Sequence, residues 1–466
     1  MNHIKRQCIA GQVKRFVNRF AQGVGSALGK VIPEREMLKW IEEEAGRFRE
    51  RVYGPVQILV LFIEQVLGAD QSCQDAVARG LSQRVALGQT ACSLNNGPYC
   101  KARKRLKLGF VKRLGHEVGQ RLTAAQTDAW RWRGREVKLV DGTTVSMPDT
   151  VPNQVAYPQS NTQKAGIGFP LARVVAIISL SCGAVLEWAV GPAKGKGTGE
   201  TAMLWALTPH FRATDVVVMD RYFSGYFLMA WLIQHQVDVV VRQHQQRSTD
   251  FRRGIRLGKR DHIVRWRRPQ RPTWMSAEDY ETMPTSLKLR ETRVGGITLV
   301  TTFTSDKEVD KLELFALYQA RWQIELDLRS IKTVMQMEIL RCKTPAMVEK
   351  EIAVHLLAYN LVRTIMAQAA AFGHIEPRKL SFKAALQLLR EFGDNLRHAP
   401  KSRRAVCVQI LLVGILQLRL RYRPNRVEPR AVKRRPKPFP LLTKPRNVLK
   451  KTLLKRQKQK HEASLR

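Results

Sequence analysis

The chain has 466 residues, and its 80 lysines and arginines outnumber its 39 aspartates and glutamates, which leaves a formal net charge of +41. A charge of that size opposes compaction unless a polyanion neutralises it, so nucleic acid is the natural partner. A membrane surface is the rival partner, but such binding usually requires a basic amphipathic helix with few other features.

The cysteines and the longest apolar runs indicate the cellular compartment of the protein. The seven cysteines are odd in number and form no C-x-x-C pair, which predicts reduced thiols and no zinc site. Cations are scattered through residues 1–20, so no signal peptide is predicted. The apolar runs at 55–68 and 405–418 contain glutamine or glutamate and are better core helices than membrane spans. We therefore expect a cytoplasmic protein with no membrane partner.

Residues 1 to about 130 are predicted to be helical, and we expect a DNA-binding domain there. A strong helix breaker stands at 95–98, where two asparagines precede Gly-Pro. A new helix is predicted over 99–122, and its start carries the cations Lys101, Arg103, Lys104 and Arg105. A turn followed by a basic helix suits docking on DNA, with the start of the helix near phosphates. A solvated cationic face explains these residues equally well, so both interpretations stay open.

From 131 to 372 the pattern becomes that of an α/β domain. Three β-branched runs, at 136–147, 172–181 and 184–191, are followed by alternating helical and strand-like segments. Three strands and then helix and strand in alternation is the element order of a ribonuclease H-like fold. The predicted fold class is therefore α/β, with a ribonuclease H-like core.

Two aspartates stand at the ends of predicted strands in this region. Asp141 follows the run VKLV, and Asp220 follows DVVVM. A carboxylate just past a buried strand lies at the sheet edge, where ligands bind. Either aspartate alone is equally well explained as a turn former or helix cap.

Residues 244–303 interrupt the α/β pattern with short alternating runs, prolines and glycines, which predicts a small inserted β subdomain. The insertion is strongly basic and contains Trp266 and Trp274. Cations can follow a phosphate backbone, and aromatic side chains can stack on exposed bases. Packing in the core is the competing explanation for both tryptophans, and no one of them is assigned to DNA.

The segment 312–336 lacks proline and glycine, and its apolar residues recur at helical spacing: Leu314, Leu317, Ile324, Leu328, Ile331 and Met335. Beside this stripe on the helical wheel lie four polar side chains: Tyr318, Arg321, Glu325 and Lys332. Taken alone, the four are explained as a solvated face with an i,i+4 ion pair. With Asp141 and Asp220, however, Glu325 completes a set of three carboxylates that can hold two Mg²⁺ ions.

The last part of the chain divides into two segments. Residues 373–420 are predicted to form a helical C-terminal region. Residues 421–466 are rich in cations and proline and carry only Glu428 and Glu462 as acids. That composition predicts a basic tail that is disordered when free.

The spacing Y-x-x-R-x-x-x-E-x-x-x-x-x-x-K, formed by Tyr318, Arg321, Glu325 and Lys332, resembles the signature of DDE transposases of the bacterial insertion sequence four family. The segments DGTTVSMPDT at Asp141 and DRYF at Asp220 look like the two aspartate blocks of that family. The resemblance covers roughly residues 55 to 370. It implies a transposase that cuts DNA at the ends of its own element and joins them to target DNA.

The resemblance also implies roles and partners. Asp141, Asp220 and Glu325 would be the catalytic residues and hold two Mg²⁺ ions, for which Mn²⁺ would substitute. Tyr318, Arg321 and Lys332 would bind phosphates near the cut, and the segment around Arg103 and Arg105 would help to bind the terminal inverted repeats. A homodimer on double-stranded DNA is expected, in the cytoplasm of a bacterium and associated with the nucleoid.

Two other functions share part of this pattern. Another ribonuclease H-like nuclease, such as a junction resolvase, would share the carboxylates but would not need the insertion or the Tyr-Arg-Glu-Lys line. A DNA-binding protein descended from a transposase, and no longer catalytic, would not need all three carboxylates. Metal-dependent cleavage of terminal-repeat DNA separates the three functions.

Overall fold

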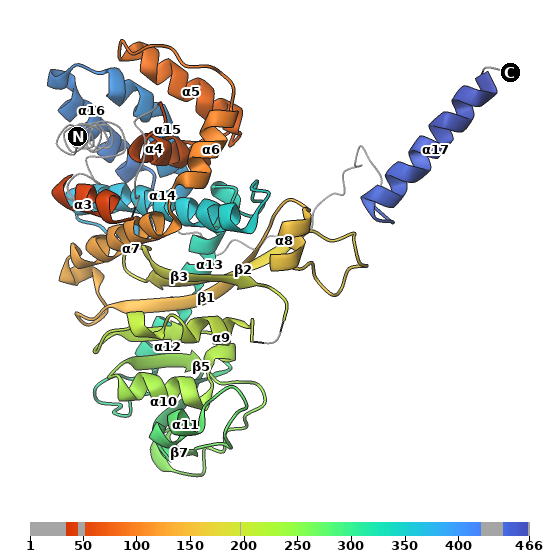
Figure 1. Ribbon diagram of the computed structural model, residues 1–466. Helices are drawn as coiled ribbons and strands as arrows, with labels where there is room; N and C mark the ends of the chain where they lie inside the picture. Colours follow the sequence, from red (N-terminus) through yellow and green to blue (C-terminus); the bar gives the residue numbers. More distant parts are fainter. Residues whose placement is uncertain (1–33, 45–51, 196, 421–440, 465–466) are drawn as a thin grey trace.

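The computed structural model describes residues 34–44, 52–195, 197–420 and 441–464 (Figure 1). The helix expected within 13–29, and Cys8, lie outside the described residues. Helices gather at one end of the molecule, and a long sheet with its hairpins forms the other end (Figure 1).

One sheet of nine strands runs through the molecule, in the order β3-β2-β1-β4-β5-β9-β8-β7-β6. The bounds of the strands are β1 Val137–Ser146, β2 Leu171–Ser179, β3 Val185–Pro192, β4 Val216–Met219, β5 Asp238–Arg242, β6 Ile255–Gly258, β7 Asp261–Arg267, β8 Ser286–Val294 and β9 Ile297–Thr301.

The first five strands confirm the predicted ribonuclease H-like core. Strands β1, β2 and β3 form an antiparallel meander, and β4 and β5 are added parallel to β1. All four residues of β4 are buried, as expected for a β-branched strand inside a parallel sheet that is covered on both faces. This order pairs the first residues of β1 with β4, so the middle of β1 lies beside the end of β4.

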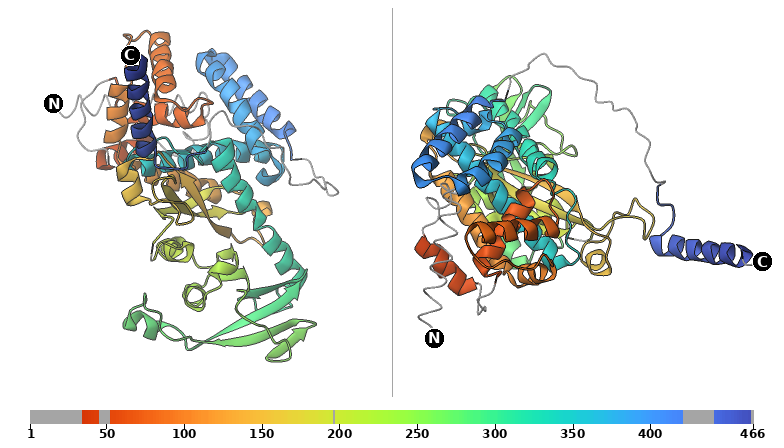
Figure 2. Two further views of the ribbon diagram at one scale, coloured as in Figure 1. Left: turned by 90° about the vertical axis from the view of Figure 1, so that its right-hand side faces the viewer. Right: turned by 90° about the horizontal axis from the view of Figure 1, so that it is seen from above.

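The predicted β insertion is present, but it is not a separate sheet. Strand β9 pairs antiparallel with β5, and β8, β7 and β6 continue outward from it, so the insertion lengthens the central sheet (Figure 2). The short helix α11 (Ala277–Thr282) lies within the insertion. Unpaired backbone groups at the edge strand β5 explain the continuation, because β9 satisfies them.

Five described helices precede the sheet: α3 Glu34–Glu44, α4 Pro55–Leu67, α5 Cys73–Ala86, α6 Gly97–Arg105 and α7 Leu108–Ala124. The helix predicted over 99–122 is therefore divided in two at Leu106 and Lys107. Helix α4 is buried over most of its length, which confirms that its apolar run is a core helix. No helix in the described ranges is long and apolar enough to cross a membrane.

The shorter elements between and beside the strands are η1 Asp128–Trp130, α8 Val151–Ala156, α9 Glu200–Trp205, η2 Thr208–His210, η3 Arg221–Phe223 and α10 Tyr226–Gln234. The later helices are α14 Pro345–Phe372, η5 Pro377–Lys379, α15 Phe382–His398, α16 Lys401–Gln417 and α17 Arg446–Ser464. Helix α14 lies between the helical end and the sheet (Figure 1).

Helix α14 joins α7 to β3 through one buried amide. The side-chain amide of Asn360 donates to the carbonyls of Gly115 (3.0 Å) and Val185 (2.8 Å), and its oxygen accepts from the N–H of Val185 (2.8 Å). Helix α7 approaches so closely that a Cβ added to Gly119 would lie 2.4 Å from the Val185 carbonyl oxygen. The sheet and the helical end therefore share one core.

The segment 312–336 buries all six predicted apolar residues, which confirms the stripe. It is not one uninterrupted helix, as the pattern predicted. Helix α12 (Lys311–Gln319) ends in a tight turn, where the N–H of Arg321 donates to the Tyr318 carbonyl, and α13 (Trp322–Arg329) follows. A π turn, η4 (Ser330–Val334), then continues α13. Such turns inside helices are frequent at functional sites.

The basic tail differs in part from its predicted disorder. Residues 446–464 form helix α17, which lies apart from the remaining described elements in Figure 1 and in the right-hand view of Figure 2. Residues 421–440 lie outside the described part.

Candidate active site

Strands β1 and β4 bring the two predicted aspartates to neighbouring positions. Leu139 of β1 is paired in register with Val218 of the parallel strand β4. Asp141 and Asp220 each come two residues later, so they occupy matching positions on neighbouring segments of the chain. Adjacent strands of a sheet lie about 4.8 Å apart. Asp141 accepts from the N–H of Gly142 (2.8 Å), and Asp220 caps η3 by accepting from the N–H of Tyr222 (2.8 Å).

Glu325 reaches the same place from helix α13. The guanidinium of Arg321 lies 3.4 Å from Oδ2 of Asp141 and 2.8 Å from Oε1 of Glu325. One arginine thus joins the middle of strand β1 to the helix, although 180 residues separate it from Asp141. Arg321 occupies the position of a cation between two of the three predicted carboxylates.

The site carries more negative charge than Arg321 balances. Burial raises the pKa of Asp141 to about 6, and the charges of Asp220 and Glu200 add to this rise, while the Gly142 N–H and Arg321 oppose it. Burial and the neighbouring carboxylates disfavour the ionised form of this carboxyl group. A cation that joins the cluster stabilises that ionised form.

Glu200, at the start of α9, is a fourth carboxylate that sequence reasoning missed. Burial, chiefly, raises the pKa of Glu200, with a further rise from Asp220. Its side chain packs against Gly142, where an added Cβ would lie 2.5 Å from Glu200 atoms, so the glycine after Asp141 makes room for it. No local pattern separates Glu200 from an ordinary acidic residue in the first turn of a helix.

The other predicted side chains on the 312–336 segment differ in their surroundings. Tyr318 is half-buried, and burial, chiefly, raises its pKa; Arg321, Arg242 and Asp220 also act on it, which places it within the cluster. Lys332 is half-buried in the π turn η4. Trp322 is 51% exposed, beside a hollow of about 250 Å³ that Tyr318, Arg321 and the β8–β9 turn also line.

Asp327, two residues after Glu325, anchors the helix that carries it. Asp327 is fully buried and accepts from the hydroxyl of Tyr359 (2.9 Å), from Arg378 (2.6 and 2.7 Å) and from Arg363. These partners lie on α14 and η5, so α13 is tied to the helical end of the molecule. The local sequence contains no signal for this cluster, because its partners are distant along the chain.

The structure corrects the assignment of Arg103 as a DNA contact. Arg103 is 5% exposed and donates to Gln65, Cys73 and Cys342, and its guanidinium lies 3.9 Å from the ring centre of Phe62. A guanidinium enclosed in this way packs the helical core and cannot reach a phosphate. Arg105 is exposed, and its role on DNA stays a prediction.

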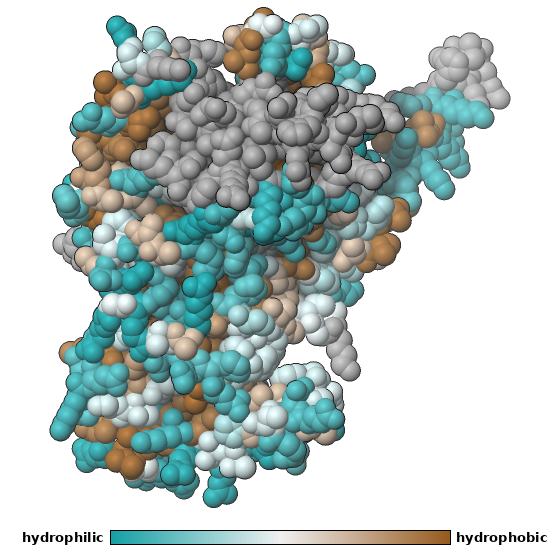
Figure 3. Space-filling view, turned by 60° about the vertical axis from the view of Figure 1, so that its left-hand side comes forward, coloured by the Kyte–Doolittle hydropathy of each residue, from teal (hydrophilic) through white to brown (hydrophobic). Residues whose placement is uncertain are grey.

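Many cations of the insertion are exposed, whereas one of its two tryptophans is buried. Trp266 is 4% exposed and donates to Glu291 (2.8 Å), so it packs the core, whereas Trp274 is 60% exposed. The exposed cations of the insertion are Arg247, Arg252, Arg253, Arg256, Lys259, Arg260, Arg265, Arg267, Arg271, Lys288 and Arg293. The face of the molecule in Figure 3 is largely hydrophilic, with scattered hydrophobic side chains.

The donors of this site fit a hard divalent cation. Carboxylate oxygens are the ligands that such ions take in proteins, and burial, with a smaller contribution from Asp220 and Glu200, raises the pKa of Asp141. Within the described residues, Asp141, Asp220 and Glu325 do not gather their oxygens within 4.8 Å of one another. Arg321, which already contacts two of them, therefore competes with a cation for the same oxygens.

Comparison with known proteins gives three similarities. Residues 132–361 match the family model described as transposase DDE domain. The chain is 29% identical over 355 residues to the transposase InsG for insertion sequence element IS4 of Escherichia coli (strain K12), covering 72% of this chain and 77% of that protein. A chain of a cryo-EM structure of the piggyBac transposase synaptic complex with hairpin DNA aligns with a TM-score of 0.41 and 11% identity, covering 90% of this chain and 86% of that one.

Proposed function

The chain belongs to the DDE transposases of the insertion sequence four family, which are metal-dependent enzymes, and we propose that it cleaves the ends of its own insertion sequence and joins them to target DNA. Asp141, Asp220 and Glu325 are the proposed catalytic residues. The observation that carries this assignment is the guanidinium of Arg321, which contacts Asp141 and Glu325 while Asp220 stands at the matching position of the next strand.

We propose Mg²⁺ as the natural metal, two ions per site, with Mn²⁺ as a substitute. Asp141, Asp220 and Glu325 would hold the ions through their carboxylate oxygens, and Glu200 would add negative charge nearby. When bound, such ions lower the pKa of the attacking water or 3′-hydroxyl and stabilise the leaving oxygen. The protein contributes the strand β1 and the end of β4, which place the two aspartates, and the helix that places the glutamate.

Arg321, Tyr318 and Lys332 are proposed to bind phosphates of the element's end. The planar fork of Arg321 matches a pair of phosphate oxygens as well as it matches a carboxylate. Metal ions held by Asp141 and Glu325 would balance the charge of these carboxylates, and the Arg321 guanidinium would then be available to bind DNA. The same residue therefore links binding of the metal to binding of the DNA end.

The remaining surfaces support binding to double-stranded DNA. The exposed cations of the insertion form one basic surface, and the helical end with Arg105 is a second region proposed to bind the terminal inverted repeats. Because the substrate of such an enzyme is the bacterial chromosome, we place the protein at the nucleoid in the cytoplasm.

We further propose that two copies pair on DNA, one for each end of the element. Helix α16 leaves Val406, Ile410 and Val413 on its surface with exposed fractions of 53%, 54% and 36%, at the spacing of one helical face. A two-fold pairing through this face suits inverted repeats, since the symmetry of the protein mirrors that of the DNA. Light scattering with and without end DNA, on the unchanged chain and on Ile410→Lys, tests it. One copy per DNA end in a cleaving complex contradicts the pairing.

The experiment that tests the catalytic assignment uses duplexes from the DNA on both sides of the gene. Asp141→Asn, Asp220→Asn and Glu325→Gln should each abolish cleavage in Mg²⁺ or Mn²⁺ and leave binding to the duplex largely intact. The matched control is Glu313→Gln on the neighbouring helix α12, whose partly exposed carboxylate pairs with Arg133. Retained cleavage in the Glu325→Gln protein contradicts the assignment.

A further inference from the structure

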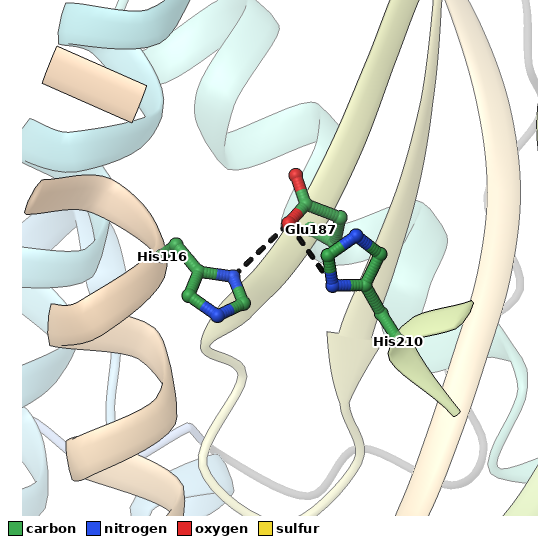
Figure 4. Close-up of side chains that lie close together, drawn as sticks. All are labelled: His116, Glu187 and His210. Carbon is green, nitrogen blue, oxygen red and sulfur yellow. Dashed lines mark hydrogen bonds and ion pairs between the residues drawn. The ribbon is translucent and has the colours of Figure 1, made fainter. Parts of the chain in front are cut away.

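A second cluster of metal-ligating side chains lies apart from the carboxylates of the active site. His116 comes from α7, Glu187 from β3 and His210 from η2 (Figure 4). Nδ1 of His116 lies 3.0 Å from Oε2 of Glu187, and Nδ1 of His210 lies 3.4 Å from the same oxygen. Among the described residues, these are the three whose ligand atoms all lie within 4.8 Å of one another.

The fold builds this cluster from two close approaches. Helix α7 lies directly against β3, as the contact between Gly119 and Val185 shows, and this contact brings His116 to the strand. Glu187 is held in place because its Oε1 accepts from the N–H of Trp188 at 3.0 Å, which leaves Oε2 for the two imidazoles. His210 ends the turn before β4, and its ring centre lies 5.5 Å from that of His116.

We propose that His116, Glu187 and His210 bind a divalent transition-metal cation of the zinc type, through Nδ1 of each histidine and Oε2 of the glutamate. Zinc takes such ligands at about 2.0–2.2 Å in a tetrahedron, which separates neighbouring ligand atoms by about 3.4 Å. The two separations in the structure are 3.0 and 3.4 Å, so the donors already stand near that spacing.

The donor set selects the class of metal. Two imidazole nitrogens with one carboxylate suit zinc, cobalt, nickel or iron, whereas Mg²⁺ requires oxygen ligands. The exposed fractions of the three side chains are 30%, 17% and 37%, so water can complete the coordination. The site is thus chemically distinct from the proposed Mg²⁺ site, and it uses no cysteine.

The surroundings of the cluster are compatible with a bound cation. Lys138 lies beside the cluster, and its ammonium donates to the carbonyl of His210 (2.9 Å). That ammonium also lies 2.6 Å from Oδ2 of the buried Asp215, so its charge is paired. The Nδ1 of His116 also lies 3.1 Å from the carbonyl of Leu186, an interaction that the metal replaces.

A metal at this position joins three parts of the chain that otherwise meet only by packing and hydrogen bonds. It ties α7, from the helical end, to β3 at one edge of the sheet and to the turn that leads into β4. The metal therefore cross-links these three elements and stabilises the folded enzyme. Occupancy of this metal site is independent of the catalytic carboxylates.

The test is a titration of the chelator-treated full-length protein with Co²⁺, followed by visible absorption, and with Zn²⁺, followed by the thermal transition. One Co²⁺ per chain should give the visible bands of low-symmetry nitrogen and oxygen ligation, without sulfur-to-cobalt charge-transfer absorption. Zn²⁺ should raise the transition temperature, and a large excess of Mg²⁺ should reproduce neither effect.

Three variants and two controls decide the assignment. His116→Gln, His210→Gln and Glu187→Gln should each weaken Co²⁺ binding by at least roughly tenfold. Circular dichroism in chelator shows whether each variant is folded, and His210→Gln is the mildest change because its side chain is the most exposed. His235→Gln, an exposed histidine stacked on Trp231, and Glu313→Gln, outside both proposed metal sites, should bind Co²⁺ as the unchanged chain does. Equal binding by the cluster variants, or a spectrum of thiolate ligation, overturns the proposal.

Discussion

Asp327 offers the sharpest test of how the catalytic helix is held. Its buried carboxylate lies between Arg363 and Arg378, whose side chains are only 6% and 10% exposed, and it also accepts from Tyr359. Asp327→Ala removes the one carboxylate that these two guanidiniums share in the described structure. Removing one partner from a buried ion pair costs about 3–5 kcal/mol, because the remaining charge is left uncompensated.

The magnitude translates into a measurable shift. A domain of this size loses roughly 2–4 °C per kcal/mol, so the thermal transition should fall by roughly 6–20 °C. Differential scanning calorimetry measures the shift, and cleavage of end DNA well below the transition measures the effect on Glu325. Because Asp327 lies two residues from Glu325, we expect slower cleavage even where the variant is folded.

Glu313→Gln, on the neighbouring helix α12, is the matched control, because it removes a carboxylate from a partly exposed ion pair with Arg133. Exposed pairs contribute about 0.2–1 kcal/mol, so its transition should move by a few degrees at most. If Asp327→Ala moves the transition no further than Glu313→Gln, then the buried cluster does not anchor α13, and the reasoning is refuted.

Three further predictions concern charge. Affinity for DNA should fall steeply with salt, by about −0.9 in log–log slope per phosphate contact, because bound cations displace counterions; a titration with a flat slope contradicts the polyanion interpretation. Arg321→Ala and Lys332→Ala should weaken complexes with end DNA more than those with random DNA, since Arg321 contacts two of the proposed catalytic carboxylates and Lys332 lies on the same helical segment as Glu325; equal losses in a gel-shift assay indicate a general cationic surface. Burial lowers the pKa of His355 to about 3, with a smaller contribution from Arg341, so the folded state keeps it neutral while the unfolded chain binds a proton below about pH 6.5. The free energy of unfolding should therefore fall as the pH drops below about 6.5, and His355→Leu should remove about 1.4 kcal/mol per pH unit of that fall. Urea unfolding at pH 7 and pH 5 measures this change, and an unchanged pH dependence in the variant contradicts the prediction.

The features that were predicted correctly from the sequence depend on a repeating pattern of residues or on the point where such a pattern ends. The apolar stripe from Leu314 to Met335 was predicted from helical spacing, and the structure buries every member. The β-branched runs and their order predicted the sheet, and the positions of Asp141 and Asp220 relative to β1 and β4 followed directly. These inferences hold because side-chain periodicity in helices and strands follows from backbone geometry alone.

Three sequence-based predictions needed correction. Arg103 stands in a run of cations that has the composition of a solvated face, yet it is the one that turns inward and packs on Phe62. The insertion was predicted as a separate unit, but the edge of β5 recruits β9 and lengthens the main sheet. The basic tail was predicted to be disordered, but 446–464 form a helix.

The sequence by itself therefore determined the element order and the buried stripe, and it supplied the residues proposed for phosphoryl transfer. Only the tertiary structure decided which side chains meet: Arg321 between Asp141 and Glu325, Asp327 between two arginines, Glu200 against Gly142, and His116 with Glu187 and His210. The physical reason is that helices and strands arise from interactions between neighbours along the chain, whereas these contacts join residues on different elements. Such contacts form only when packing of the core brings those elements together, and no local pattern records that outcome.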